Sequence, residues 1–289
     1  MDTVLITTIN EALLWSVMAI GVFIMYKILD IPDLSAEGVF PLGAAIYASQ
    51  VVAGASPVVA TTLAVVGGAL AGLVAGLIHT KLKIPALLTG ILVMTGLYTI
   101  NIKVMGSGNI SLLGKENLMD MINFLPEDFA TMLLGAIIVL IVIILLYLFY
   151  RTQIGLAFIA TGNNPVMAQA NGINIDLMKI VGYMLANALI ALSGSLIAQN
   201  NGYSDISMGV GIIVIGLAAV IVATVIFKNV PFLPRLFTVV LGAFIYRAII
   251  SIVLLFNIDP MYLKLVSAIT LTLLLTLSNM EIFKKKRKG

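Results

Sequence analysis

Charged side chains are scarce in this chain, and those within apolar stretches are the first candidates for chemistry. Arg247 lies near the middle of the stretch LGAFIYRAIISIVLLF. A planar guanidinium is well suited to hold a carboxylate through two parallel hydrogen bonds. Within a bilayer, an arginine costs about 2.5 to 3.5 kcal/mol on insertion scales, so it must face protein or water. Two interpretations stay open: Arg247 binds a substrate carboxylate, or it pairs internally with Glu11 or Glu37 or reaches the membrane interface.

A second polar group consists of Asp33, Ser35 and Glu37, and its D-x-S spacing returns in Asp205 and Ser207. A carboxylate in such a group can meet the ammonium of a substrate. The alternative is helix capping, with Asp33 or Ser35 as the N-cap and Glu37 in the first helical turn. Together with the arginine described above, these five residues are the candidate substrate-path residues.

The remaining polar residues point to structure more than to chemistry. Asn101 and Asn187 lie in apolar stretches, where an amide side chain is expected to hydrogen-bond a neighbouring helix. His79 is the only histidine and the chain has no cysteine, so a set of zinc ligands is lacking. We therefore expect no catalytic residue, no metal and no cofactor bound by this chain.

The elements that must position these residues are membrane helices. Of the 289 residues, 61% are hydrophobic and 10% are charged, against a usual charged share of about 25%. Apolar stretches of about 20 residues recur, which is the length that crosses a bilayer as a helix. We expect an all-α integral membrane protein, a polytopic bundle of about nine spans (eight to ten), with one transmembrane domain over 1–289. The expected spans are 5–26, 37–53, 58–79, 85–102, 131–150, 179–199, 207–227, 236–256 and 261–279.

Lysine and arginine residues indicate the orientation of this bundle. They gather at 79–83, 151–179, 228–235 and in the basic tail 281–289, all of which alternation puts on one side, the cytoplasm. We expect a multi-pass protein of the cell membrane with a cytoplasmic C-terminus and an extracytoplasmic N-terminus. The start lacks the basic region of a secretory signal, so the first helix is expected to remain. The tail can also bind anionic membrane lipid.

The two ends of the chain show a faint similarity at a spacing of about 172 to 175 residues. An odd number of spans separates the copies, so they would have opposite orientations, as in transporters with inverted repeats. We expect repeat halves at about 30–102 and 203–279, with the two D-x-S segments as broken elements beside a pathway. The matched segments are DLS at 33–35 with DIS at 205–207, VVxGA at 65–69 with 239–243, and Pro85 with Pro260.

The segment 151–179 carries helix punctuation between two apolar stretches. Asn164 is a good N-cap, Pro165 fits the first helical position, and the Asn-Gly pair ending at Gly172 can close a helix in a left-handed turn. A two-turn helix is expected from Pro165 to residue 170. Asn174 can cap a longer helix that follows, so the segment is expected to be ordered.

This segment, with the sequence RTQIGLAFIATGNNPVMAQANGI, resembles the cytoplasmic coupling segment of permeases of ATP-binding-cassette importers of the branched-chain amino acid and ribose type. DLSAEGVFPLGA at 33–44 and IPALLTGILVMTGLY at 84–98 are similar to other segments of that family, and the resemblance runs from about residue 20 to 277. It implies a permease that couples to an ATPase through this segment. The implied coupling residues are Gly155, Asn164, Pro165, Val166, Met167, Ala168, Gly172 and Ile173.

One departure from the family narrows the substrate. FKNVPFLPR replaces a glycine-rich stretch before the penultimate helix, and GAFIYRAII with DPMYLKLVSAI is similar to a branch associated with aromatic amino acid uptake. The resemblance thus implies an aromatic or branched-chain amino acid and puts a sugar in doubt.

The same resemblance implies partners. They are cytoplasmic ATPase subunits that hold ATP and magnesium, an extracytoplasmic substrate-binding lipoprotein, and a second permease copy in a homodimer, with no nucleic acid. The chain itself has no GxxxxGK phosphate loop, in keeping with a non-catalytic subunit. The alternative is an ion-coupled secondary transporter or channel, for which Asp33 and Glu37 are the plausible ion-binding pair.

Overall fold

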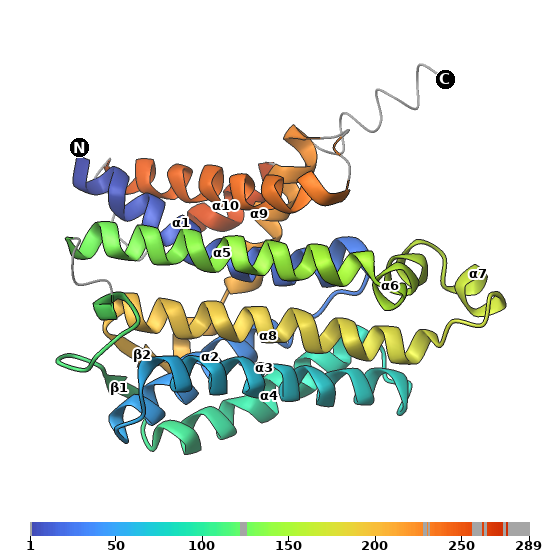
Figure 1. Cartoon of the computed structure of the whole chain (residues 1–289), viewed down its shortest axis with the longest axis horizontal. Coiled ribbons are helices and arrows are strands. Elements are labelled where there is room, and N and C mark those ends of the chain that lie inside the picture. The colour runs from blue at the N-terminus through green and yellow to red at the C-terminus, as the bar shows by residue number, and fades with distance from the viewer. Residues whose placement is uncertain are drawn as a thin grey trace.

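The long helices of the protein lie side by side along roughly one axis, as the computed structural model shows (Figure 1). The structure describes residues 2–121, 126–227, 230, 232–255, 262, 265–273 and 276. Within these residues, the helices that could cross a membrane number seven, by length and composition. The protein is therefore an all-α, multi-pass membrane protein, as the composition predicts.

The elements follow one another with short connections. The α-helices are α1 (Asp2–Phe23), α2 (Ala36–Val52), α3 (Pro57–Thr80), α4 (Ala86–Met105), α5 (Glu127–Arg151), α6 (Gln153–Asn163), α7 (Pro165–Ala170), α8 (Ile175–Asn201), α9 (Ile212–Ile226) and α10 (Phe232–Leu255). A π-helix, η1 (Ile24–Ile28), continues α1, and 3-10 turns form η2 (Met119–Met121) and η3 (Ile206–Gly209). The two short strands are β1 (Asn109–Ser111) and β2 (Tyr203–Asp205).

Seven of the nine expected spans correspond to helices of membrane-crossing length. The expected second span is α2, whose 17 residues reach only about 25 Å, less than the roughly 30 Å of the hydrocarbon core. Most residues of α2 are buried, so it lies within the bundle and not on its lipid surface. The expected ninth span lies largely outside the described residues, although 265–273 are helical. The count of nine therefore stays a prediction.

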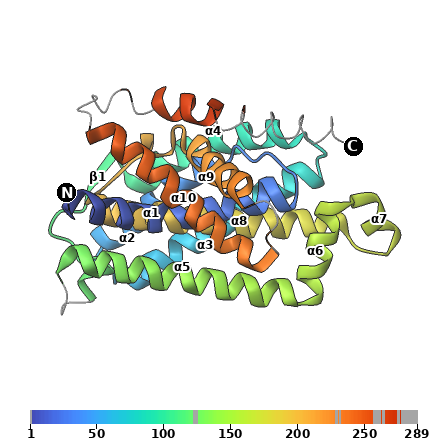
Figure 2. The same ribbon diagram turned by 90° about the horizontal axis from the view of Figure 1, so that it is seen from above.

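The centre of the bundle is α8, which packs against α1, α2 and α3 (Figure 2). Glycines make these contacts close. A Cβ added at Gly72 would overlap the carbonyl oxygen of Tyr183, and one at Gly43 would overlap that of Ala191. Small residues at crossings let membrane helices approach to backbone distance, so dispersion and polar contacts between backbones replace the hydrophobic effect that lipid removes.

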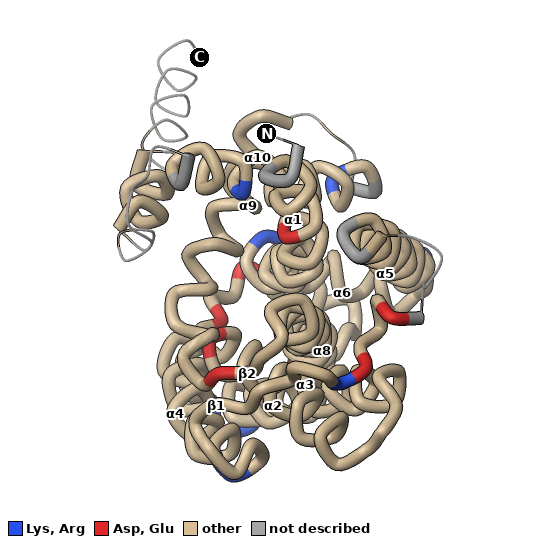
Figure 3. The backbone as a smooth tube through the Cα atoms, turned by 90° about the vertical axis from the view of Figure 1, so that its left-hand side faces the viewer, with Lys and Arg blue, Asp and Glu red and all other residues tan. Residues whose placement is uncertain are grey.

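The two ends of the bundle are marked by contacts between distant loops. At one end β1 pairs antiparallel with β2, with Ile110 opposite Ser204. At the other end, Lys81 lies 3.7 Å from Asp176, joining the turn after α3 to the start of α8. Each contact joins two segments that the charge distribution assigns to the same side. Figure 3, viewed from the left-hand side of Figure 1, shows how few charged residues the bundle carries.

Two segments enter the bundle without forming a regular helix. The first is 29–35, which follows η1 and leads into α2, and the second is η3 with the turn at 210–211, which leads into α9. The first contains the whole D-x-S sequence of Asp33 and Ser35, and the second follows directly after Asp205 and contains Ser207 of the other. Irregular backbone at membrane depth is tolerated only where protein or a water-filled cavity satisfies it, so these two breaks direct attention to a functional site.

Candidate functional site

The first break is tied to the central helix by a buried polar network. The Asp33 carboxylate accepts hydrogen bonds from the backbone amide of Ser35 at 2.9 Å and from Nδ2 of Asn187 at 3.0 Å. The Ser35 hydroxyl donates to Oδ1 of Asn187 at 3.3 Å. Asp33 is only 6% exposed and lines a small pocket of about 80 Å³. The network therefore fixes the break against α8, and the hydrogen bonds that Asn187 makes outside α8 go to the segment that leads into α2 instead of to a neighbouring helix.

The capping alternative holds only in part at this break. Ser35 occupies the N-cap position of α2, but its side chain accepts no capping hydrogen bond, and its hydroxyl donates to Asn187. Glu37 lies in the first turn of α2, as expected. The Ser35 side chain therefore contributes to the contact with α8 and not to the cap of α2.

The second break repeats the local geometry of the first. The Asp205 carboxylate accepts hydrogen bonds from the backbone amide of Ser207, at 2.7 Å, and from its hydroxyl. These bonds, led by the one from the Ser207 side chain, hold the pKa of Asp205 below its usual value, although slight burial opposes them. Nδ2 of Asn109 in β1 also donates to Asp205, at 3.2 Å. Asp205 therefore closes a turn at the β1–β2 end of the bundle.

The two breaks meet inside the bundle. The carboxylate of Glu37 accepts a hydrogen bond from the backbone amide of Gly211 at 3.1 Å, at the N-cap position of α9. A Cβ added at Gly209 would overlap the carbonyl oxygen of Glu37 and crowd Pro41. Only a glycine lets η3 cross α2 at this distance. The starts of α2 and α9, separated by more than half of the chain, are therefore in direct contact.

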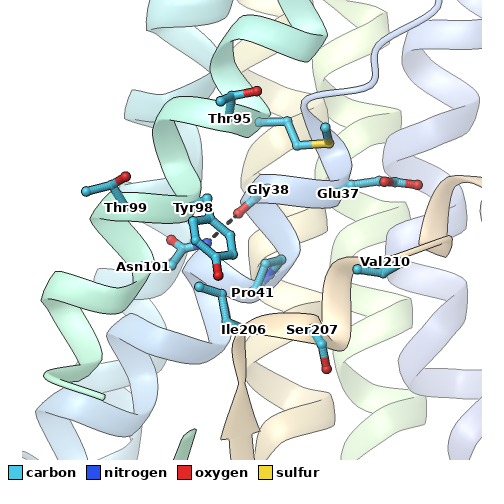
Figure 4. A pocket seen from close by; sticks show the side chains of 11 residues that line it. Glu37, Gly38, Pro41, Thr95, Tyr98, Thr99, Asn101, Ile206, Ser207 and Val210 are labelled. Atoms are coloured by element: carbon cyan, nitrogen blue, oxygen red, sulfur yellow. Dashed lines mark hydrogen bonds between the residues drawn. The ribbon is translucent and has the colours of Figure 1, made fainter. Parts of the chain in front are cut away.

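A pocket of about 570 Å³ opens beside this crossing, between α2, α4 and η3 (Figure 4). Glu37 and Ser207 are the two candidate substrate-path residues that line it. Its size lies within the range of about 300 to 1,000 Å³ that is usual for ligand sites. The lining residues are Glu37, Gly38, Pro41, Met94, Thr95, Tyr98, Thr99, Asn101, Ile206, Ser207 and Val210.

The most deeply buried polar side chain of this pocket is that of Asn101, at 1% exposed. Its Nδ2 donates to the carbonyl oxygen of Gly38 at 3.0 Å, which confirms the expected interhelical hydrogen bond (Figure 4). Its Oδ1 has no hydrogen-bond partner among the described residues. One α4 turn earlier, the Tyr98 side chain is 56% exposed and lies beside Asn101.

Arg247 is not among the residues that line this pocket. It forms an ion pair with Glu11, and its guanidinium carbon lies 5.6 Å from the centre of the Trp15 ring. It lines a separate pocket of about 310 Å³ between α1, α9 and α10. Of the two interpretations left open by the sequence, this geometry matches the internal ion pair with Glu11.

The coupling segment has the local structure that the sequence predicts. The Asn164 side chain accepts a hydrogen bond from the amide of Met167 at 3.0 Å, and α7 runs from Pro165 to Ala170. Gly172 follows with φ of +80°, a left-handed conformation. The Asn174 side chain then caps α8 by accepting from the amide of Leu177 at 3.1 Å. Both N-caps and the glycine turn are confirmed.

The predicted coupling residues divide into exposed and packed ones. Val166 is 77% exposed and Met167 63% exposed, on a helix that projects beyond the end of the bundle (Figure 1). Ala168 is buried, and Gly155 is buried at the corner between α5 and α6, where a Cβ would overlap the carbonyl oxygen of Phe149. The sequence offers no reason to divide these residues. Their burial shows that Val166 and Met167 lie on the surface, whereas Ala168 and Gly155 pack inside the protein.

The helix α6 connects the projecting α7 to the first break. A Cβ added at Gly162 would overlap the carbonyl oxygen of Ile28 at the end of η1. Phe158, also on α6, is fully buried and stacks edge to face against Phe149 of α5, with ring centres 6.0 Å apart. A displacement of α6 therefore presses directly on the π-helix that precedes residues 29–35.

Sequence reasoning missed the contribution of α4 to the pocket. Thr95, Tyr98 and Thr99 form one exposed face of this helix. Polar side chains are unfavourable against lipid, so these three are expected to line a pocket. Their i, i+3 and i+4 spacing in an apolar span was the signal available. Within the described part of the chain, no three His, Asp or Glu side chains come together as a group that could hold a metal ion.

Broken helices that meet within a polytopic bundle are typical of membrane transporters. The comparison with known families is more specific: residues 4–275 match the permease component of the branched-chain amino acid transport system, and the chain belongs to this family. It is the permease of an ATP-binding-cassette transport system, a non-catalytic membrane subunit. The family predicted from the coupling segment is thereby confirmed.

Individual relatives support this assignment. The tyrosine transport system permease protein of Clostridioides difficile is 42% identical over 282 residues, covering 98% of this chain and 94% of the relative. An uncharacterised protein of Rickettsia prowazekii is 33% identical, covering 93% and 95%. The autoinducer 2 import system permease protein of Escherichia coli O9:H4 is 27% identical, covering 65% and 54%. No solved structure matches the chain.

Proposed function

We propose that this permease passes an aromatic amino acid from an extracytoplasmic binding protein to the cytoplasm by alternating access. The observation that carries this proposal is the contact between the starts of α2 and α9 beside the 570 Å³ pocket. Two broken elements of opposite direction that meet at a pocket can open it to either side when one moves against the other. The 42% sequence identity with a tyrosine transport system permease supports an aromatic amino acid as the substrate.

ATP hydrolysis reaches this pocket through α7 in our proposal. The exposed Val166 and Met167 dock on a cytoplasmic ATPase subunit, which holds ATP and magnesium. Asn164, Pro165 and Gly172 shape this helix, Ile173 begins the return to α8, and the buried Gly155 and Ala168 support it from within.

The movement continues from α6 to the pocket. The close packing of Gly162 on Ile28 passes the displacement of α6 to η1, and thus to residues 29–35. The Asp33–Asn187 hydrogen bond keeps this break against α8, and Glu37 joins it to the start of α9. Each link in this route is a direct contact, so it can be tested one contact at a time.

The remaining features complete the proposed transporter. Halves at about 30–102 and 203–279 form an inverted repeat within about nine spans, supported by the matching Asp33 and Asp205 turns. The permease works as a homodimer in the cell membrane, surrounded by lipid. The α7 end and the basic tail 281–289 face the cytoplasm, and the β1–β2 end and the N-terminus face outward, as the basic residues near α7 favour.

Reconstitution tests the proposal. The permease is placed in liposomes with the ATPase subunit, with ATP inside and the binding protein and labelled tyrosine outside. Uptake that requires both ATP and the ATPase subunit is the expected result. Uptake by the permease alone, driven by an ion gradient, would establish the alternative of a secondary transporter or channel, in which the buried Asp33 carboxylate is the group to examine.

A further inference from the structure

We infer that the pocket between α2, α4 and η3 is a cation-selective substrate site, in which Oδ1 of Asn101 accepts a hydrogen bond from the ammonium group of the substrate. This inference rests on the proposed function. It adds that the permease distinguishes an amino acid from a sugar by the ammonium group of the substrate. The pocket residues come from three elements that approach one another only in the folded chain.

The orientation of the Asn101 side chain is fixed by its other end. Nδ2 donates to the carbonyl oxygen of Gly38 at 3.0 Å, so the end of the amide without a partner among the described residues is the oxygen, which is an acceptor. The side chain is 1% exposed, and Oδ1 has no hydrogen-bond partner among the residues that the structure describes. Buried polar atoms are almost always satisfied, so this acceptor calls for a donor from a ligand or a water that the ligand replaces.

The charge of the pocket selects a cation. None of the eleven lining residues is a lysine or an arginine, and Glu37 carries the only formal charge among them. Figure 4 shows the Glu37 side chain pointing away from Tyr98, so it supplies negative potential at the edge of the pocket and not a contact beside Asn101. Pro41 has no backbone N–H, so the Glu37 carbonyl lacks its i+4 partner and adds another acceptor dipole to this turn. A carboxylate or phosphate that brings no ammonium group with it would be repelled here.

The rest of the pocket fits an apolar or aromatic body. Met94, Ile206 and Val210 provide aliphatic surface, and the Tyr98 ring provides a face for stacking and for a cation. The volume of about 570 Å³ is ample for one aromatic amino acid. A sugar would place hydroxyl groups against these side chains and would bring no charge to the acceptors.

The other charged candidate does not compete for this role. The guanidinium of Arg247 is paired with Glu11 and lines a different pocket. The pocket at Asn101 is therefore expected to recognise the ammonium end of the substrate, and a substrate without a carboxylate still meets its requirements.

Direct binding to the permease–ATPase complex in lipid nanodiscs, without the binding protein, tests the inference. The probes are tritiated tyramine, which keeps the ammonium, and 3-(4-hydroxyphenyl)propionate, which keeps only the carboxylate. We expect tyramine to bind and the propionate to bind at least about tenfold more weakly. Equal affinities, or stronger binding of the propionate, would overturn the inference.

Variants locate the site. Asn101→Leu removes the acceptor and should weaken tyramine binding by about tenfold or more. Tyr98→Leu, on a side chain that is 56% exposed, leaves packing intact and should weaken tyramine binding more than binding of 3-methylbutylamine, which has no ring. Thr62→Val, on an exposed α3 position outside the pocket, is the matched control and should bind as wild type does.

Unchanged tyramine affinity in both pocket variants would refute the site, even if tyrosine uptake is normal. Tyramine binding that depends on Asn101, together with no ATP-driven tyrosine uptake by the full system, would retain the cation site and remove the proposed function. The two claims can therefore fail separately.

Discussion

The backbone amide of Gly211 donates a hydrogen bond to the carboxylate of Glu37 at 3.1 Å. This bond joins the first turn of α2 to the N-terminal end of α9, where a negative charge is favoured by the helix dipole. It is the point at which the two breaks in the bundle hold each other, and it lies at the edge of the candidate pocket.

We expect Glu37→Leu to destabilise the permease by about 1 to 3 kcal/mol, because the amide at the start of α9 loses a charged acceptor. Glu37→Gln keeps an oxygen acceptor and should lose less. Thermal unfolding in detergent measures both. If both variants unfold at the same temperature as wild type, the Glu37–Gly211 hydrogen bond does not contribute to stability.

Gly172→Val should uncouple ATP hydrolysis from substrate without preventing membrane insertion. Gly172 has φ of +80°, a conformation that a β-branched residue strongly disfavours, so α7 would end differently. The measurement is ATP hydrolysis with and without substrate-loaded binding protein. Gly172→Asn tolerates the left-handed turn and is the matched control. Full stimulation in the valine variant would contradict the role of this helix end.

Gly162→Ala tests the contact between α6 and the π-helix. The added methyl group overlaps the carbonyl oxygen of Ile28, so α6 must shift, with a cost of about 1 to 3 kcal/mol. We expect lower stimulated ATP hydrolysis and a lower melting temperature. Gly96→Ala, where a Cβ meets nothing within 4 Å, should lower neither quantity. Identical behaviour of the two variants would exclude this contact from the coupling route.

Arg247→Ala leaves the partly buried Glu11 carboxylate without its partner and should destabilise the permease by about 1 to 3 kcal/mol. The double variant Arg247→Met with Glu11→Gln removes both charges and should regain most of the loss. Uptake of tyrosine and thermal unfolding are measured together. Recovery of stability without recovery of uptake would show that Arg247 contacts the substrate.

Val166→Asp should prevent binding of the ATPase subunit while leaving the permease as stable as wild type. The Val166 side chain is 77% exposed on α7, so a charge there disturbs an apolar contact surface and no internal packing. Co-purification with the ATPase subunit is the measurement. Gln169→Asp, also exposed on α7, adds the same charge at a polar position and should retain more binding. Wild-type recovery of the ATPase subunit with Val166→Asp would contradict docking through this face.

The sequence alone was sufficient for the local features of the coupling segment. Asn164 and Asn174 cap helices through bonds to amides three residues away, and Gly172 takes a left-handed turn within the same short stretch. Hydropathy likewise predicted seven spans that the structure contains. These features depend on neighbouring residues or on transfer from water to lipid, so they can be read along the chain.

Only the tertiary structure decided the partners of the intramembrane polar groups. Asp33 bonds Asn187 across 154 positions, and Glu37 bonds Gly211 across 174. Asn101 meets Gly38 and the pocket, whereas Arg247 pairs with Glu11. The sequence shows that these carboxylates and amides lie in apolar stretches, where each needs a polar partner. Which partner it finds depends on how closely the helices approach, and glycines at their crossings set that distance in three dimensions.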